Sequence, residues 1–353
     1  MSDIRPKVSI GLPVFNGENY LRDALGSILE QTFRDFEVII SDNASTDTTG
    51  DICREYAAKD PRRRYYRNSK NLGAARNFNL VFELSSGKYF KWAAHDDVLG
   101  KEFLSRCVSV LDEDPSVVAC FAMTSNIDKD GNRLGTYEHD NETSFDSHSP
   151  HERFRELMDM RHWCMAVFGV IRSTALRQTP LIGGYVGSDR CLLAELGLMG
   201  RICRVPEYLF YRRDHPGSSV EKMKLPQDRL GWFSPQGSGR ICFPSWRYGR
   251  EYLRSANKVA LDPRERRLCC LAVGVWYAKR TKWLLADLVV AARLLMRRIP
   301  IGRQIEKLLF LDLKRPLRQA MMRWHTGRRL IEFRREILFP GGGRDARRAK
   351  KKA

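Results

Sequence analysis

The N-terminal part of the chain alternates between short apolar runs and amphipathic stretches. Residues 8–15 (VSIGLPVF) are apolar almost throughout, which predicts a buried strand. Residues 18–31 then repeat apolar side chains at intervals of three and four, the period of one helical face. The same order recurs, with strands expected at 36–42, 64–67 and 88–97 and helices ending near 59, 84 and 111. This alternation predicts an α/β fold with a mostly parallel sheet covered by helices on both faces.

Farther along, the pattern continues less regularly. We expect a strand at 117–124, and the sequence Lys-Asp-Gly-Asn at 129–132 is typical of a hairpin turn. The apolar run at 165–172 is too short to assign by its period alone. A further helix is expected at 189–199.

Beyond about Pro226 the α/β pattern stops. Residues 228–250 are rich in Gly, Pro, Ser and Trp and are interpreted as a linker, and the chain from Pro263 onward is interpreted as helical and basic. The domains expected are therefore an α/β domain at 1–227, followed at 228–353 by a linker and a basic, mainly helical region.

Charge changes this picture mainly at the C-terminal end. The formal net charge is +19 and the pI is about 9.7. Residues 301–353 hold 16 Lys and Arg against 5 Asp and Glu, so this short part supplies +11 of the total. A basic tail favours an anionic partner, which could be a membrane surface, nucleic acid or an acidic polymer.

Membrane-spanning and secreted classes do not fit the sequence. No stretch reaches the roughly 18–20 apolar residues of a spanning helix. Residues 1–7 are polar, so we expect no signal peptide. The nine cysteines are irregularly spaced and form no C-x-x-C, which argues against a disulfide framework or a structural zinc site. We therefore expect a cytoplasmic protein, with peripheral contact at the inner face of the membrane as a further expectation from the basic tail.

Acidic residues end two of the predicted strands. Asp42 closes the strand 36–42, and the pair Asp96-Asp97 closes the strand 88–97. Ligands bind beyond the carboxyl ends of strands in such sheets, so these carboxylates should face one crevice. Adjacent carboxylates repel each other unless a cation neutralises them, and Mn²⁺ or Mg²⁺ prefers such oxygen ligands. The alternative is that these residues only cap the helices that follow.

Several segments, in this order, resemble the family 2 glycosyltransferases. They are VSIGLPVFNGENYL, SILEQTF, FEVIISDNASTD, NLGAARN and HDD, within roughly residues 6–220. The resemblance implies the GT-A fold, transfer with inversion, a nucleotide-sugar donor and a divalent metal.

The resemblance also implies roles for the acidic residues. Asp97 would bind the metal, Asp96 would contact the ribose or the sugar, and Asp42 would contact the base, commonly uracil. The family often has two acids at the position of Asp42, where this chain has Ser41 and Asp42.

Three further residues are expected around the donor. Pro13 and Phe15 end the first strand and could pack near the base, although ordinary core packing of Phe15 is the alternative. Arg76 begins a helix, and a helix N-terminus with an Arg favours a diphosphate. A solvated surface Arg is the alternative interpretation of Arg76.

An inverting transfer also needs a general base. Asp189, in GGYVGSD, begins a helix whose dipole would keep the carboxylate ionised, and it matches the second member of the family's frequent Glu-Asp pair. The alternative is a plain capping Asp. His215 could ligate Mn²⁺, with Arg212 or Arg213 at the phosphate, or His215 could be a surface residue. Trp163 is expected near the acceptor.

The function expected is transfer of a sugar, UDP-linked by the family pattern, to a hydroxyl of a glycan or lipid-linked acceptor in cell-envelope polysaccharide synthesis. A non-catalytic sugar-nucleotide-binding protein is the first alternative. A nucleic-acid-binding protein is the second, but the sequence has no zinc finger, RNP or helix-turn-helix pattern, so no nucleic acid is expected. A nucleotidyltransferase is disfavoured because no Gly-rich phosphate loop with a following Lys is present.

The C-terminal region suggests a peripheral membrane contact. The apolar segments 268–278 and 283–296 are separated by basic residues and are too short to span a bilayer, but could lie in its interface. Arg297, Arg298 and the basic run at 344–352 add positive charge. The alternative is a helical subdomain packed on the catalytic core, with a solvated tail.

Overall fold

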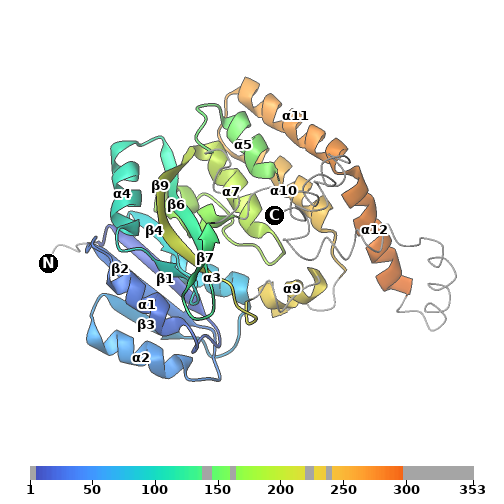
Figure 1. Ribbon diagram of the computed structural model, residues 1–353. Coiled ribbons are helices and arrows are strands. Elements are labelled where there is room, and N and C mark those ends of the chain that lie inside the picture. The colour runs from blue at the N-terminus through green and yellow to red at the C-terminus, as the bar shows by residue number, and fades with distance from the viewer. Residues whose placement is uncertain (1–4, 137–144, 160–163, 219–225, 236–240, 297–353) are drawn as a thin grey trace, which may run out of the picture.

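The computed structural model describes residues 5–136, 145–159, 164–218, 226–235 and 241–296 (Figure 1). Its centre is a nine-stranded sheet in the order β3-β2-β1-β4-β8-β6-β9-β5, with β7 paired to β6. The N-terminal strands are β1 (Val8–Val14), β2 (Phe36–Asp42), β3 (Arg63–Arg67) and β4 (Tyr89–Trp92). The helices that connect them are α1 (Leu21–Leu29), α2 (Thr49–Lys59) and α3 (Ala74–Glu83).

This N-terminal half is a parallel α/β unit, as the hydrophobic pattern predicts. β1 pairs in parallel with β2 and β4, and β2 pairs in parallel with β3. Every residue of β1 and β2 is buried, which explains their continuous apolar runs. Because the strands are parallel and joined by helices, their carboxyl ends meet at one edge of the sheet, where Asp42 lies. We call it the donor edge.

The second half of the sheet is mixed, whereas the pattern predicted a mostly parallel arrangement. Its strands are β5 (Val98–Leu99), β6 (Val117–Ile127), β7 (Arg133–Thr136), β8 (Val170–Arg172) and β9 (Arg201–Arg213). β8 runs antiparallel to both β4 and β6, so it reverses the direction of the sheet, while β6 and β9 are parallel. The predicted hairpin turn is present between β6 and β7, with Gly131 at a φ of 90°.

Helices cover both faces of the sheet. The remaining ones are α4 (Phe103–Glu113), α5 (Pro150–Met158), η1 (Met165–Phe168), α6 (Ser173–Leu176), α7 (Ser188–Met199), α9 (Pro226–Phe233), α10 (Pro244–Lys258), α11 (Pro263–Lys279) and α12 (Thr281–Met296). One core lies between the sheet and α1, α2 and α4, with Leu25, Ile52 and Leu104 among its members. The other lies between the sheet and α3, α5 and α7.

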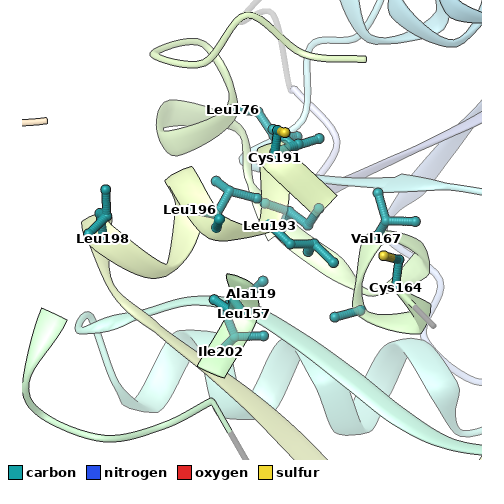
Figure 2. Packing of buried hydrophobic residues seen from close by; sticks show 14 of the residues in the cluster. Ala119, Leu157, Cys164, Val167, Leu176, Cys191, Leu193, Leu196, Leu198 and Ile202 are labelled. Atoms are coloured by element: carbon teal, nitrogen blue, oxygen red, sulfur yellow. The ribbon is translucent and has the colours of Figure 1, made fainter. Parts of the chain in front are cut away.

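The helix α7 is central to the second core. Figure 2 shows Leu193 and Leu196 of α7 among Leu157 of α5, Ala119 of β6 and Ile202 of β9. The C-terminal helices extend this core: Tyr252, Cys269 and Trp276, from α10 and α11, belong to the same buried cluster. A second tie is polar, since the Glu195 carboxylate of α7 accepts hydrogen bonds from Ser255 and Lys258 of α10.

Residues 228–250, interpreted above as a linker, instead include most of α9 and the start of α10. The Gly, Pro, Ser and Trp content suggested a linker, but Tyr248 and Tyr252 lie four residues apart on one face of α10 and are both buried. Their burial holds this segment as a packed helix. The domain division at 227/228 stays a prediction. All nine cysteines lie in the described part of the chain, and none forms a disulfide. Within those same residues, no helix combines the length and apolar character needed to cross a membrane.

Candidate active site

Asp42 lies at the donor edge and is completely buried. One carboxylate oxygen accepts the backbone N–H of Ser45 at 2.8 Å. The other accepts the Tyr65 hydroxyl at 3.0 Å and the Arg67 guanidinium at 2.8 Å. Both oxygens are therefore engaged, and Arg67, which is 45% exposed, presents positive charge at the surface of the edge. Neither Tyr65 nor Arg67 was expected here, because the strand β3 gives no motif that points to them.

The loop after β3 is fixed to the end of β2 by a network of amides. The Asn43 side chain donates to Asn71 Oδ1 at 2.9 Å and accepts the N–H of Leu72 at 2.8 Å. Asn77, buried in α3, donates to the Ser41 carbonyl at 2.9 Å and accepts the Ser41 hydroxyl at 2.6 Å. These hydrogen bonds hold the start of α3 beside the donor edge without a ligand.

Arg76 lies in the first turn of α3 but its side chain leaves the donor edge. Its guanidinium pairs with Glu83 at 2.7 Å, two turns farther along the helix, and both side chains are about half exposed. The structure therefore does not bring Arg76 to the other predicted site residues. A diphosphate contact by Arg76 stays a prediction.

Pro13 and Phe15 flank the same edge. Pro13 is buried in β1 opposite Ser41, while Phe15, just past the strand, is 41% exposed. The alternative of ordinary core packing is therefore wrong for Phe15. An exposed aromatic ring at the donor edge is available for stacking on a planar ligand.

The structure brings Asp96, Asp97 and His215 together. The loop after β4 carries both carboxylates, and Asp96 Oδ2 lies 3.0 Å from Nε2 of His215. Asp97 Oδ1 accepts the backbone N–H of Arg213 at 3.0 Å. His215 is 8% exposed and packs edge-on against Tyr20, so it is a buried residue of the site and not a surface histidine. His215 contacts Asp96 directly, whereas binding of a metal ion by His215 together with Asp97 stays a prediction.

The two carboxyl groups differ in acidity because their surroundings differ. Burial raises the pKa of Asp97 to about 7, and the neighbouring negative charge of Asp96 acts in the same direction. Burial acts on Asp96 as well, but its hydrogen bond with His215 and the nearby His95 hold the pKa of Asp96 below its usual value. A divalent cation would favour the ionised form of both groups.

These residues fit a divalent cation as part of its coordination shell. No group of three or more His, Cys, Asp and Glu side chains arranged to hold a metal occurs in the described ranges. Mg²⁺ and similar hard cations are commonly held by one or two carboxylates, with waters and substrate phosphates as the other ligands. The Asp96-Asp97 pair matches this arrangement, in which two carboxylates hold the cation and waters and phosphates complete its shell.

Arg213 holds the site together, a role that the sequence did not indicate. Its guanidinium is 2% exposed and donates to the Asp96 carbonyl at 3.0 Å, the Lys129 carbonyl at 3.1 Å and the Asp23 carboxylate at 2.9 Å. It also lies 4.5 Å from the centre of the Tyr20 ring. Arg213 thus joins β9 to α1, to the carboxylate loop and to the hairpin after β6. The expectation that Arg213 contacts a phosphate is wrong, because its donors point into the protein.

Lys91 is a second buried cation near the carboxylates. It lies fully buried in β4, and its ammonium group donates to the Phe168 carbonyl at 2.5 Å and lies 4.5 Å from the Phe103 ring centre. Burial lowers the pKa of Lys91 to about 7. Its positive form in turn acts to lower the pKa of Asp97.

Asp189 lies in the first turn of α7, where a helix start was predicted. Its carboxylate accepts the backbone N–H of Arg190 at 2.9 Å. The preceding Gly187 has a φ of 78°, and a Cβ there would collide with Tyr248, so only glycine fits this entry to the helix. Asp189 thus comes from a different element than the Asp96–His215 group, and its catalytic role stays a prediction. Trp163 lies outside the described residues.

Comparison with known proteins adds to this geometry. The domain described as Glycosyl transferase family 2 matches residues 9–177. Residues 9–177 of this chain are thus similar to glycosyl transferase family 2. The match includes Asp42, Asp96 and Asp97 and ends before Asp189 and His215.

Curated relatives share part of the sequence of this chain. An uncharacterized glycosyltransferase of Rickettsia prowazekii is 35% identical over 108 residues, which cover 31% of this chain and 33% of the relative. Chondroitin synthase of Escherichia coli is 35% identical over 129 residues, covering 36% of this chain and 19% of that protein. The putative teichuronic acid biosynthesis glycosyltransferase TuaG of Bacillus subtilis is 32% identical over 139 residues, which cover 39% of this chain and 55% of TuaG. The chain thus spans about a third of the first of these relatives and a smaller share of the second.

Solved structures resemble this chain over most of its length. S. aureus TarS in complex with UDP-GlcNAc has a TM-score of 0.58 at 16% identity, covering 83% of this chain and 82% of TarS. The mannosyltransferase PcManGT from Pyrobaculum calidifontis, in complex with GDP-Man and Mn²⁺, has a TM-score of 0.50 at 16% identity and covers 96% and 89%. These likenesses confirm the GT-A-like α/β fold.

Proposed function

We propose that this chain is an inverting glycosyltransferase that moves a sugar from a UDP-linked donor to a hydroxyl of a glycan or lipid-linked acceptor, with help from Mn²⁺ or Mg²⁺. The observation that carries the proposal is the contact of Asp96 with His215, beside Asp97, at the donor edge of a family 2 domain. His215, from a distant part of the sequence, lies there against a pair of adjacent acids that favours a cation.

The donor-binding roles follow from the positions of the side chains. Asp97 would hold the cation. His215 would become a second ligand if its imidazole gave up its contact with Asp96 and bound the metal instead. That exchange would release the Asp96 carboxylate for a ribose or sugar hydroxyl. The bound cation would supply positive charge that stabilises the departing nucleotide diphosphate.

The nucleotide base would lie between Phe15 and the end of β2. Phe15 offers an exposed ring, while Asp42 is buried and would contact a base only if it gave up one of its present partners. Arg76 can reach a diphosphate by leaving Glu83, since an exposed ion pair of this kind stabilises the fold by less than about 1 kcal/mol.

The acceptor side of the reaction would belong to Asp189. The N-terminus of α7 favours the ionised carboxylate, which would take the proton from the acceptor hydroxyl as its oxygen attacks the anomeric carbon. The bond from that carbon to the diphosphate oxygen breaks in the same step, and attack from the opposite side inverts the centre.

The comparisons support the substrate class. TarS and PcManGT were solved with nucleotide sugars, and PcManGT also with Mn²⁺. TuaG and chondroitin synthase are named for polysaccharide synthesis. We extend this to the synthesis of a cell-envelope polysaccharide, with the enzyme placed peripherally at the inner face of the membrane. The excess of basic residues at 228–353 supports that placement, and Arg297, Arg298 and 344–352 within it lie outside the described residues.

A thermal-shift screen of UDP- and GDP-sugars with and without Mn²⁺ tests the proposal. A donor at about 100 times its Kd should raise the Tm by roughly 5 °C, and only when Mn²⁺ is present. Release of nucleotide diphosphate should then be measured for the stabilising donor. A failure of every nucleotide sugar to shift the Tm with Mn²⁺ would contradict the proposal. A shift without any turnover would identify a non-catalytic sugar-nucleotide-binding protein instead.

A further inference from the structure

The two last described helices expose large apolar side chains to solvent. Leu271 and Val275 of α11 are 65% and 52% exposed. On α12 the exposed fractions are 56% for Leu285, 45% for Leu288 and 53% for Leu295. We call these five side chains the outer apolar face. A surface helix normally turns such residues inward, so several together indicate a surface that binds something apolar.

Both helices already use their opposite sides for packing. Val273 and Trp276 of α11 are buried in the second core. Leu284 and Ala291 of α12 are buried, and its Asp287 accepts the backbone N–H of Ser245 in α10 at 2.7 Å. Figure 1 shows α11 and α12 at the periphery, on the far side of α10 from the sheet. The side chains of the outer apolar face therefore remain exposed although both helices pack on the rest of the protein.

The charge around this face is positive. Arg264 and Arg267 are exposed on α11, and Lys279 and Lys282 are exposed where α11 meets α12. The acidic residues within these two helices are Glu265 and Asp287. Glu265 is 17% exposed and paired with His151, while Asp287 is buried. The exposed charge on these helices is thus basic, beside exposed leucines.

This combination selects among partners. Nucleic acid would neutralise the basic residues but leave the leucines in water. A second copy would bring the same positive face against itself, which disfavours a symmetric contact. Residues 297–353 hold 18 Lys and Arg against 5 Asp and Glu, so their net charge has the same sign as the face, which disfavours them as its partner. An anionic lipid bilayer accepts both the leucines and the positive charge.

We propose that the outer apolar face docks onto an anionic membrane surface, with α11 and α12 lying in the interface. With 17 and 16 residues, both helices are shorter than a spanning segment, which agrees with interfacial placement. The leucines enter the boundary of the acyl chains, while Lys279 and Lys282 remain at the level of the headgroups. This proposal rests on the peripheral membrane placement proposed above and names the surface that makes the contact, whereas it does not depend on glycosyl transfer itself.

Flotation of the full chain with vesicles tests the proposal. Wild-type protein should float with vesicles of phosphatidylcholine and phosphatidylglycerol at low salt, and much less with phosphatidylcholine alone. The triple substitution Leu285→Gln/Leu288→Gln/Leu295→Gln should lower the lipid partition coefficient at least about tenfold. Leu134→Gln is the matched control, since Leu134 is 58% exposed on β7, and its partition should equal that of wild type.

The Tm of the triple variant should stay near that of wild type, because the substituted side chains are exposed. If it does not, Lys279→Gln/Lys282→Gln replaces it, with Lys101→Gln, whose side chain is 70% exposed, as the control. Failure of wild type to float with the anionic vesicles overturns the proposal. So does flotation of the triple variant at the wild-type level. A dimer in light scattering that the triple variant dissociates would assign the face to a second copy, which also overturns it.

Discussion

The donor edge and the outer apolar face depart from ordinary protein surfaces in opposite directions. At the donor edge charged groups are buried, as with Asp42 at 0% and Arg213 at 3% exposure. On the outer apolar face large aliphatic groups are exposed, as with Leu285 at 56%. Both arrangements cost free energy unless a partner compensates, so both mark places where the chain does more than fold.

The difference lies in where the partner is. At the donor edge the buried charges find partners within the chain, because Arg213 bonds to Asp96, Lys129 and Asp23. On the outer apolar face no partner is visible in the described part of the chain. We therefore expect single substitutions at the donor edge to lower activity or stability in assays of the protein alone. Substitutions on the outer apolar face should have an effect only in assays that include its partner.

The largest effect is expected for Asp189→Asn. Loss of the general base should reduce the transfer rate by roughly 10²–10⁴-fold, while donor affinity stays largely intact, because the base acts on the acceptor proton. Single-turnover transfer and donor titration measure the two quantities separately. Asp51→Asn is the matched control, since Asp51 also lies in the first turn of a helix, α2, and is 74% exposed. Parallel loss of donor binding would make Asp189 a donor-binding or structural residue.

Asp97→Asn should come next. Removing the carboxylate that holds the cation should lower turnover by at least about 10²-fold and abolish the Mn²⁺-dependent part of donor binding. Turnover and thermal shift across a Mn²⁺ titration provide the measurement. Asp130→Asn, at a side chain that is 61% exposed, should leave both unchanged. Near-normal activity of Asp97→Asn in Mn²⁺ would rule out this assignment.

Arg213→Met tests whether the donor edge is held together from within. The substitution removes a buried guanidinium that donates to the carbonyl groups of Asp96 and Lys129 and to the Asp23 carboxylate. The free energy of unfolding should therefore fall by about 3 kcal/mol. Urea denaturation measures it. Arg106→Met is the control, because Arg106 is 57% exposed and pairs with Glu207 at the surface. A loss below about 0.5 kcal/mol would show that Arg213 does not tie these segments together.

The smallest effect concerns the inner side of α12. Burial raises the pKa of Asp287 to about 6, above the value of about 4 in an unfolded chain. Between these values the folded chain binds more protons than the unfolded chain, so stability should decrease as the pH rises through this window. Asp287→Asn should flatten the decrease by about 1 kcal/mol in urea denaturation at about pH 4 and pH 6. An unchanged slope would show that Asp287 is not the titrating group.

The parts of the fold that the sequence predicted are those set by patterns within a short stretch of residues. β1 to β4 and their helices have clear periods, and the end of β2 marks Asp42. The predicted strand 88–97 is shorter in the structure, where β4 ends at Trp92 and the Asp96-Asp97 pair lies in the loop that follows. β9 was missed because arginines interrupt its apolar pattern, and Arg213 was misinterpreted with it. Its bond to Asp23 joins residues 190 positions apart, a relation that no local pattern encodes. Tyr65 and Arg67 were missed for the same reason.

The position of β9 also bears on how the protein can be divided. The residues that match the family end at 177, yet β9 begins at Arg201 and lies in the sheet between β6 and β5. A fragment cut at the family boundary would open much of one side of β6, an 11-residue strand, to pairing with other chains. It would also lose the arginine that fixes the carboxylate loop. The smallest piece fit for expression and crystallisation therefore extends well beyond the homologous segment, at least through His215.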